Sequence, residues 1–370
     1  MKIAMVGHKR VPSREGGIEV VVEELSTRMV ALGNEVTLYN RKGHHVAGAE
    51  YDIKPIEGYK GVKIKYVPTI ERRGLAAVTS SFFGCLFAAV GHYDVVHVHA
   101  EGPAKFCWIP KIFGKKVVVT IHGLDWQRSK WGNFASRYIL SGEKSAVKHA
   151  DQIIVLSKGV QDYFTKRYNR ATVYIPNGVN RPVVLPADEI KRKWGLEKNS
   201  YILFVGRIVP EKGIKYLLKA WELIKTDKKL VLAGSPSDTQ EFNSEVHKLA
   251  DDRVLFTGFT QGKALEELYS NAYLYVLPSD LEGMPLTLLE AMSYGNCCLT
   301  SDISECTEVV EDKAVTFHKS DTRDLKNKMQ YLISESAVVE RYKATACDFI
   351  CNKYNWNDTV IRTLETYREK

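Results

Sequence analysis

The chain has 370 residues, of which 45% are apolar and 26% are charged, and its formal net charge at pH 7 is +8. These fractions are those of a soluble globular protein, and the length is too great for one ordinary hydrophobic core. The seven cysteines are odd in number and lack Cys-x-x-Cys spacing, which favours reduced thiols over a disulfide framework or a zinc site.

The first half of the chain alternates predicted strands with predicted helices. Residues 3–6 read as a short buried strand, without the long apolar run or the small-residue cleavage site of a signal peptide. Residues 19–32 carry apolar side chains at helical spacing, and Gly33 follows as a stop signal. Further strands are predicted at residues 35–39, 62–67, 94–98, 116–121 and 152–156.

The alternation breaks into a turn-rich linker near residues 175–180 and then restarts. Strands are predicted at 201–205, 229–233, 254–257, 274–277 and 297–300, with helices at 213–224, 263–271 and 287–293 and further helices toward the C-terminus. This rhythm predicts an α/β protein with two Rossmann-like domains, residues 1–180 and 181–354, that face each other across a cleft. In such parallel sheets, ligands bind at the carboxyl ends of the strands.

Charge is unevenly divided along the chain. Residues 1–180 contain 26 Lys and Arg against 15 Asp and Glu, whereas the remainder contains 26 against 29. A basic first half predicts an anionic partner: a membrane surface, a lipid-linked diphosphate or a nucleic acid. An ordinary solvated surface is the alternative.

Residues 74–91 carry no charge, and their number touches the lower limit for a membrane-spanning helix. Three consecutive hydroxyl residues at 79–81 interrupt the apolar run, so a buried helix of the first domain is the preferred interpretation. An interfacial helix, with Arg72 and Arg73 against lipid phosphates, is the second, and a true span is the least favoured.

The first candidate motif ends in Gly16-Gly17, between a strand and a helix. Because glycines lack side chains, these amides can approach a phosphate closely at the helix N-terminus. The spacing is not that of the dinucleotide fingerprint G-x-G-x-x-G, and a flexible surface loop is an equal alternative.

Histidines follow two of the predicted buried strands. His122 comes directly after residues 116–121 and is expected to face the cleft, although a lone histidine there is more often a hydrogen-bonded structural residue. His97 and His99 share one face of their strand, but no third ligand for a metal is evident.

Two cations flank the strand–loop–helix corner that begins at Gly206-Arg207 and ends at Lys212-Gly213. Arg207 and Lys212 at this spacing make a good diphosphate clamp. The loop lacks the final Gly-Lys-Ser/Thr of a Walker A loop, so ATP hydrolysis is not implied. Two exposed cations without a ligand are the alternative.

Two glutamates eight residues apart, Glu282 and Glu290, lie around the start of a predicted helix. The amides from Gly283 to Leu286 are expected to be free donors at that N-terminus, a position that favours anions. Glu282 can accept hydrogen bonds from sugar hydroxyls, and Glu290 can accept two from a ribose diol. Acidic capping of the helix is the alternative.

Together these motifs resemble the retaining glycosyltransferases of the E-x7-E type, a family 4-like group with the two-domain GT-B fold. The resemblance covers nearly the whole chain. It includes the Gly16-Gly17 loop, His122-Gly123, Asn177-Gly178-Val179, Gly206-Arg207 through Lys212-Gly213, and Glu282 through Glu290. A narrower resemblance, carried by residues 6–19, is to bacterial rhamnosyltransferases of surface-polysaccharide assembly.

The resemblance implies a role for each matched side chain. Arg207 and Lys212 would hold the donor diphosphate, Glu290 would bind ribose, and Glu282 would orient the donor sugar and its phosphate. His122 would contact the donor sugar near the reacting carbon.

The donor-binding set would be completed by backbone and small residues of both domains, namely Gly16, Gly17, Gly206, Gly283, Met284, Pro285 and Leu286. Met284 departs from the family, which often has Phe there. This departure should alter the packing near the phosphate loop without removing its amides.

The resemblance also implies the reaction. A hexosyl group, with rhamnosyl as the narrower candidate, would pass with retention from a UDP-, dTDP- or GDP-sugar to a glycan or lipid-linked acceptor. No metal and no cofactor would be needed, since the chain has no Asp-x-Asp and its cations would carry the charge. The enzyme would be cytoplasmic, in peripheral contact with the inner membrane face, without a nucleic-acid partner. A last helix, at about residues 355–370, would cross back to the first domain.

Two alternatives remain at this point. A nucleotide-sugar 2-epimerase has the same fold and a similar length, but the complete E-x7-E motif argues against it. A non-catalytic module that binds an anionic ligand would leave the donor-site residues unexplained. For the acceptor side we expect a basic surface of Lys63, Lys65, Arg72 and Arg73.

Overall fold

The computed structural model describes residues 1–45, 47–52, 54–72, 74–127, 132–235 and 240–369. It divides into two compact units. The first unit comprises Met1–Asn177 and Trp356–Lys370, and the second comprises Gly178–Asn355. The sequence analysis placed these divisions after residues 180 and 354. Trp356–Lys370 contains the last helix, which therefore groups with the N-terminal residues.

The first unit is built on an eight-stranded sheet of order β3-β4-β2-β1-β5-β6-β7-β8. Every pairing is parallel except that of the edge strand β3 with β4. The strands are β1 (Lys2–Val6), β2 (Glu35–Arg41), β3 (Gly58–Tyr59), β4 (Val62–Val67), β5 (Val95–His99), β6 (Lys116–Ile121), β7 (Gln152–Val155) and β8 (Val173–Tyr174).

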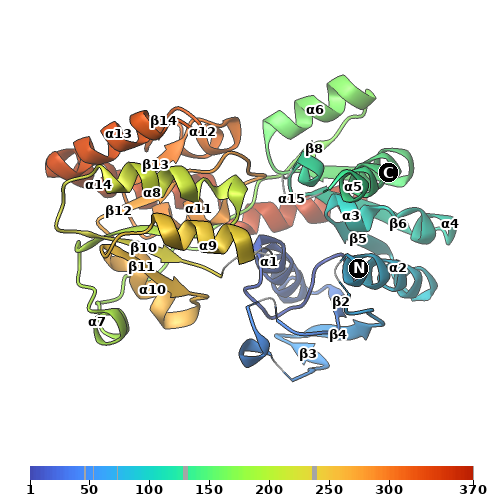
Figure 1. Cartoon of the computed structure of the whole chain (residues 1–370). Coiled ribbons are helices and arrows are strands. Elements are labelled where there is room, and N and C mark those ends of the chain that lie inside the picture. The colour runs from blue at the N-terminus through green and yellow to red at the C-terminus, as the bar shows by residue number, and fades with distance from the viewer. Residues whose placement is uncertain (46, 53, 73, 128–131, 236–239, 370) are drawn as a thin grey trace. The chain divides into compact units, whose positions relative to one another are not determined.

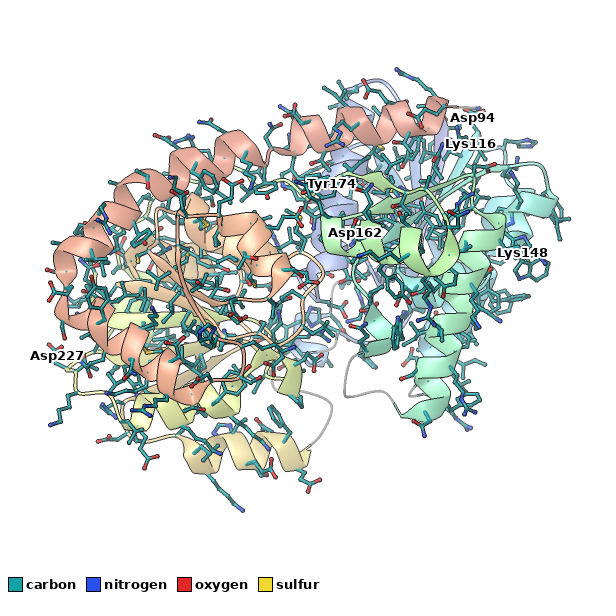
Figure 2. All side chains as sticks on the ribbon, turned by 90° about the horizontal axis from the view of Figure 1, so that it is seen from above. Asp94, Lys116, Lys148, Asp162, Tyr174 and Asp227 are labelled. Atoms are coloured by element: carbon teal, nitrogen blue, oxygen red, sulfur yellow. The ribbon has the colours of Figure 1, made fainter. Side chains whose placement is uncertain are left out.

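The central strands form because their sequences are nearly continuous apolar runs, as expected for a parallel sheet covered on both faces. All five residues of β5 are buried, and so are the last five of β6. Asp94 and Lys116 mark the amino-terminal edge of this sheet in Figure 2, where Val95 pairs with Lys116. Side chains that follow β5 and β6 therefore lie at the opposite, carboxyl edge.

Helices cover this sheet on both faces. They are α1 (Gly17–Ala31), α2 (Leu75–Val90), α3 (Glu101–Ala104), α4 (Trp108–Ile112), α5 (Asn133–His149), α6 (Lys158–Tyr168) and α15 (Trp356–Arg368), with short 3-10 turns η1 (Ala49–Tyr51) and η2 (Asp125–Gln127). In Figure 1, α15, in red, lies beside α1, in blue, and the two helices pack on each other.

The uncharged segment at residues 74–91 is helix α2, as predicted. Its buried face consists of small residues (Ser80, Ser81, Gly84, Cys85, Ala88 and Ala89), so the helix approaches the sheet closely. Larger apolar side chains, among them Phe87 and Val90, are exposed on its outer side. Among the residues that the structure describes, no helix combines the length and apolar character that crossing a bilayer requires.

The second unit is built on a six-stranded, all-parallel sheet of order β11-β10-β9-β12-β13-β14. Its strands are β9 (Tyr201–Val205), β10 (Lys229–Ala233), β11 (Val254–Gly258), β12 (Leu274–Leu277), β13 (Cys298–Ser301) and β14 (Val315–Phe317). Its helices are α7 (Glu189–Trp194), α8 (Ile214–Glu222), α9 (Gln240–Leu249), α10 (Gly262–Asn271), α11 (Leu286–Ser293), α12 (Ser304–Val310), α13 (Thr322–Ser334) and α14 (Ser336–Lys353), with the 3-10 turn η3 (Pro210–Lys212).

The two sheets share one feature that positions functional residues. In each sheet, the early strands are added on one side of a central strand, and the later strands are added on its other side. The reversal falls between β1 and β5 in the first unit and between β9 and β12 in the second. Loops leaving two such neighbouring strands diverge, which opens a site at their carboxyl ends. The predicted α/β class with parallel sheets is confirmed.

Close packing of α3 on α5 gives a test of this fold. A Cβ added at Gly142 of α5 would lie 1.9 Å from the backbone oxygen of Glu101. Gly142→Ala should therefore lower the free energy of unfolding by about 1–3 kcal/mol, although alanine ordinarily stabilises a helix. Urea denaturation measures the difference.

Gly132→Ala is the matched control, because Gly132 has φ −69 and a Cβ there would meet nothing within 4 Å. Its stability should stay within about 1 kcal/mol of the wild type. Equal stability of the two variants would contradict the close packing of α3 on α5.

Candidate functional site

In the second unit, Gly234 and Gly213 have no side chain, and this allows the loops around the strand reversal to pack directly against neighbouring backbone. Gly206 follows β9 with φ +155, and a Cβ at Gly234 would lie 1.8 Å from the oxygen of Gly206. Gly213 has φ +70, and a Cβ there would lie 2.0 Å from the oxygen of Pro278. The loops after β9 and β12 are therefore held together, and Gly234 is a requirement that the sequence analysis missed.

Hydrogen bonds lock the same two loops. The amide of Asp280 donates to the carbonyl oxygen of Glu211 (2.9 Å). The hydroxyl of Tyr216 is 2.5 Å from the oxygen of Pro278 and 2.7 Å from the carboxylate of Asp280. The residues predicted to bind a donor thus lie on a braced frame rather than on independent loops.

Lys212 and Glu282 form an ion pair within this frame. Lys212 Nζ lies 2.5 Å from Glu282 Oε1, and their side chains are 14% and 9% exposed. Ser279 donates to the same carboxylate oxygen at 2.6 Å, and its carbonyl oxygen accepts from Ser301. The sequence analysis assigned Lys212 to phosphate and Glu282 to sugar as separate groups. The structure brings them into direct contact.

Arg207 lies at the start of the loop after β9, immediately beyond Gly206. Its side chain is half-buried and makes no hydrogen bond or ion pair to a residue that the structure describes. Lys212, in contrast, is already paired. The two cations of the predicted clamp therefore differ: one is held in place, and the other lacks a described partner.

Glu290 lies in the second turn of α11 and is oriented by a buried tyrosine. Tyr269 of α10 donates from its hydroxyl to Glu290 Oε2 at 3.1 Å. The Tyr269 ring stacks on Tyr294 with centroids 5.4 Å apart. Burial foremost, and then the charge of Glu290, holds the pKa of Tyr269 well above its ordinary value, so the phenol remains a donor.

The N-terminus of α11 requires one correction. We expected the amides from Gly283 to Leu286 to be free donors, but Pro285 has no N–H and precedes the first helical residue, Leu286. The donors in this stretch are therefore those of Gly283, Met284 and Leu286. The Met284 side chain is buried.

The predicted residues of the first unit lie at the carboxyl edge of its sheet. Gly16 precedes α1 in an extended conformation and Gly17 begins the helix, without a side-chain cap. Glu19, in the first turn, is buried and accepts from the amide of Lys9 at 2.9 Å. Its charge acts on the pKa of both His8 and His122, so the start of α1 lies near these histidines.

His122 follows β6 and is joined to His99, the last residue of β5. A hydrogen bond of 3.1 Å links His99 Nδ1 and His122 Nε2. His97 is held separately, with 2.6 Å to the hydroxyl of Tyr367 and 2.7 Å to that of Thr120. Both ring nitrogens of His97 are therefore engaged, which excludes it from the metal site considered above.

These histidines are neutral near pH 7. Burial is the main cause: it lowers the pKa of His122 to about 4 and that of His97 to about 3, and it places that of His99 well below its ordinary value. Neighbouring histidines lower the last two further. Among the described residues, no group of three or more His, Cys, Asp or Glu side chains is arranged to hold a metal ion.

Family models match both halves of the chain. The model described as Glycosyltransferase Family 4 matches residues 15–181, and the model described as Glycosyl transferases group 1 matches residues 186–348. Both models describe glycosyltransferases, and the chain is therefore a glycosyltransferase.

Relatives and solved structures of glycosyltransferases agree over the full length. An uncharacterised glycosyltransferase of Methanocaldococcus jannaschii is 26% identical, over 100% of this chain and 98% of its own. Sucrose-phosphate synthase from Thermosynechococcus elongatus superposes with a TM-score of 0.79 at 22% identity, over 99% and 98% of the two chains. Anabaena HepE, in complex with UDP and glucose, gives 0.80 at 18% identity, over 99% of each chain. These neighbours establish the GT-B fold.

The glycosyltransferase also contains a buried carboxyl pair that the sequence analysis missed. Glu101 begins α3 and Glu143 lies on α5, and both are fully buried. Glu143 Oε1 accepts from the hydroxyls of Tyr163 (3.0 Å) and Tyr168. Neither oxygen of Glu101 makes a hydrogen bond of ordinary geometry within the described chain. No sequence signal marks them, because they are 42 positions apart, with α4, β6 and η2 between them.

Glu101 is protonated in the folded glycosyltransferase. Burial first, then Asp125 and Glu143, raises its pKa from 4.5 to about 10. In the unfolded chain the same group ionises near 4.5, so between these values the folded state holds the extra proton. The contribution of this group to the free energy of unfolding therefore falls as pH rises, by up to ~1.4 kcal/mol per pH unit.

Glu101→Gln, which keeps the shape without titrating, should be increasingly stabilised relative to the wild type as pH rises from 5 to 9. Melting temperatures across this range, which stays below the folded pKa of about 10, measure the difference. Glu57→Gln, at an exposed position, is the control, and its melting temperature should change with pH as that of the wild type does. A pH-independent difference for Glu101→Gln would show that Glu101 is ionised in the folded state.

Proposed function

We propose that this glycosyltransferase moves a hexosyl group, with rhamnosyl as the narrower candidate, from a nucleotide-diphosphate sugar to a glycan or lipid-linked acceptor of bacterial surface-polysaccharide synthesis. The anomeric configuration is retained and no metal takes part. The observation that carries this proposal is the set of Arg207, Lys212, Glu282 and Glu290 on the braced loops and helix at the carboxyl edge of one sheet.

The donor diphosphate is assigned to Arg207 and Lys212. Lys212 has three N–H donors, and its contact with Glu282 uses only part of this capacity. A phosphate oxygen can therefore bind a cation whose position is already set by Glu282. Arg207 adds a planar, bidentate donor that suits phosphate geometry. Together they stabilise the negative charge that grows on the leaving phosphate.

The sugar and the ribose are assigned to the two glutamates. The contacts of Glu282 with Lys212 and Ser279 both use Oε1. Its Oε2 takes part in neither contact and is assigned to a hydroxyl of the donor sugar. Glu290, oriented by Tyr269, is assigned to the ribose diol. The complex of HepE with UDP and glucose supports a donor of this class.

The remaining assignments lie in the first unit. His122 contacts the donor sugar near the reacting carbon as a neutral ring, since its pKa is lowered to about 4. The amides of Gly16 and Gly17, at the N-terminus of a 15-residue helix, bind donor phosphate. The configuration is retained because the acceptor oxygen bonds to the anomeric carbon on the face from which the donor phosphate departs. The bond from that carbon to the phosphate oxygen breaks, and this oxygen takes the proton of the acceptor hydroxyl.

Glu290→Ala should weaken the binding of the cognate nucleoside diphosphate by about 10- to 100-fold, because hydrogen bonds to a charged group contribute ~1.5–3 kcal/mol each. Titration calorimetry with UDP, GDP and dTDP measures the affinity and identifies the base in the same series. Glu222→Ala, at an exposed position on α8, is the matched control. Unchanged affinity in Glu290→Ala would remove the ribose assignment.

A membrane surface is the proposed location of the acceptor. The outer sides of α2 and α4, which pack on each other, expose Leu75, Phe87, Val90, Trp108, Ile112 and Phe113. Ile112 is 72% exposed and Phe113 is 53% exposed. Residues 101–150 carry nine Lys and Arg against three Asp and Glu, and two of those three are the buried Glu101 and Glu143. Exposed apolar side chains in a part of the chain that is rich in positive charge suit an anionic lipid surface.

The basic residues expected from the sequence differ in their surroundings. Lys63 pairs with Glu35 at 3.4 Å, and Lys65 lies over the Tyr39 ring. Arg72 is exposed just before α2 and so extends the α2–α4 surface. Arg73 lies outside the described residues.

Ile112→Ser with Phe113→Ser should reduce binding to vesicles of phosphatidylcholine and phosphatidylglycerol by at least about tenfold, because each side chain loses ~1–2 kcal/mol of apolar burial. Flotation measures binding, and nucleoside diphosphate affinity should stay unchanged. Leu223→Ser, at a position 62% exposed in the second unit, is the control. Failure of the wild type to bind these vesicles would exclude the membrane surface, whereas the donor assignment would stand.

A further inference from the structure

His99 is a buried histidine at the strand reversal of the first unit, and none of the roles proposed above uses it. It is the last residue of β5 and is fully buried. Nδ1 is engaged with His122, and Nε2 has no hydrogen-bond partner in the described chain. The bond to His122 is therefore the polar contact that sets the orientation of the His99 ring.

The backbone and the neighbouring ring hold His99 in place. Gly7 has φ +107 and lies so near that an added Cβ would be 2.3 Å from the oxygen of His99. The His97 ring packs beside His99 with centroids 4.1 Å apart, and His97 is itself bound to Tyr367 and Thr120. His99 cannot move away from His122 without disturbing β1, β6 and α15.

A bond between two neutral imidazoles allows only two arrangements. Each ring carries one N–H, so one ring must donate and the other must accept. If His99 donates, His122 Nε2 accepts and His122 Nδ1 is a donor. If His99 accepts, His122 Nε2 donates and His122 Nδ1 is an acceptor. The tautomers of His99 and His122 are therefore coupled, and the arrangement that the pair adopts determines which kind of hydrogen bond His122 Nδ1 can make with a substrate hydroxyl.

We propose that His99 is a positioning residue, which fixes the ring orientation and the tautomer of His122 through the Nδ1–Nε2 hydrogen bond. The inference rests on the proposed function in one respect, namely that His122 contacts the donor sugar. Fixing the tautomer before the substrate arrives removes a reorganisation step from the reaction, and this raises turnover more than affinity.

His99→Phe keeps an aromatic ring beside His97 and removes the partner of His122. His99→Asn returns an amide that can donate or accept near the position of Nδ1. Tyr367→Phe is the matched control, because it breaks the hydrogen bond of His97 and leaves the His99–His122 bond intact. Circular dichroism checks the fold of each variant.

The ring nitrogens of His122 report the tautomer directly in 15N–1H spectra of histidine-labelled protein, assigned with His122→Ala. One tautomer is expected in the wild type and in Tyr367→Phe, and a mixture in His99→Phe. Turnover of His99→Phe should fall about 10- to 100-fold, with donor KM changed by less than about threefold. His99→Asn should recover a single tautomer and most of the turnover.

Unchanged His122 signals in His99→Phe would overturn the proposal whatever the activity, and so would a changed tautomer with unchanged turnover. Wild-type turnover in His122→Ala would instead refute the role proposed for His122 in catalysis. The tautomer spectra would still decide whether His99 fixes His122, so the two failures are distinguishable.

Discussion

The structure depends on one constraint, the reversal of strand order at the centre of each parallel sheet. A parallel strand cannot return through a tight hairpin, so every connection except that from β2 through β3 to β4 carries an α-helix across a face of the sheet. The loops that follow the parallel strands therefore emerge at one edge. Where the order reverses, β1 from β5 and β9 from β12, two such loops diverge and leave the strand ends accessible. Except for His122, which follows the adjacent strand β6, the residues assigned to chemistry follow these strands or lie in the first two turns of the next helix.

The two units use the carboxyl edge in opposite electrostatic ways. In the second unit, Lys212 and Glu282 form an ion pair that is largely buried, and Arg207, in the loop after β9, is a second cation. This arrangement suits a charged ligand, because a phosphate can bind Lys212 while Lys212 stays paired with Glu282. In the first unit, burial keeps His99 and His122 neutral, so they can act only through directed hydrogen bonds. The charged side chains assigned to the donor thus belong to the second unit, and the neutral histidines belong to the first.

Much of the fold could be predicted because parallel strands leave a strong local signal. Residues 201–205, 229–233 and 274–277 were predicted as strands and appear with the same bounds, since each is an apolar run between turn residues. Short elements such as β3 and β14 were missed, because two or three residues carry no periodicity. At the site, the residue types that we assign to the donor could be read from Gly206-Arg207 and from the spacing of Glu282 and Glu290.

By itself, the sequence determined the α/β class, the two-part organisation and the residue types at the strand ends, because these follow from local periodicity and from motifs contained in short segments. Only the tertiary structure decided which side chains meet. Tyr269 with Glu290, Glu101 with Glu143, and His97 with Tyr367, 270 positions away, are contacts between separate elements. Burial, which neutralises the histidines and Glu101, likewise depends on all the elements packed around a residue, and no local stretch of sequence encodes it.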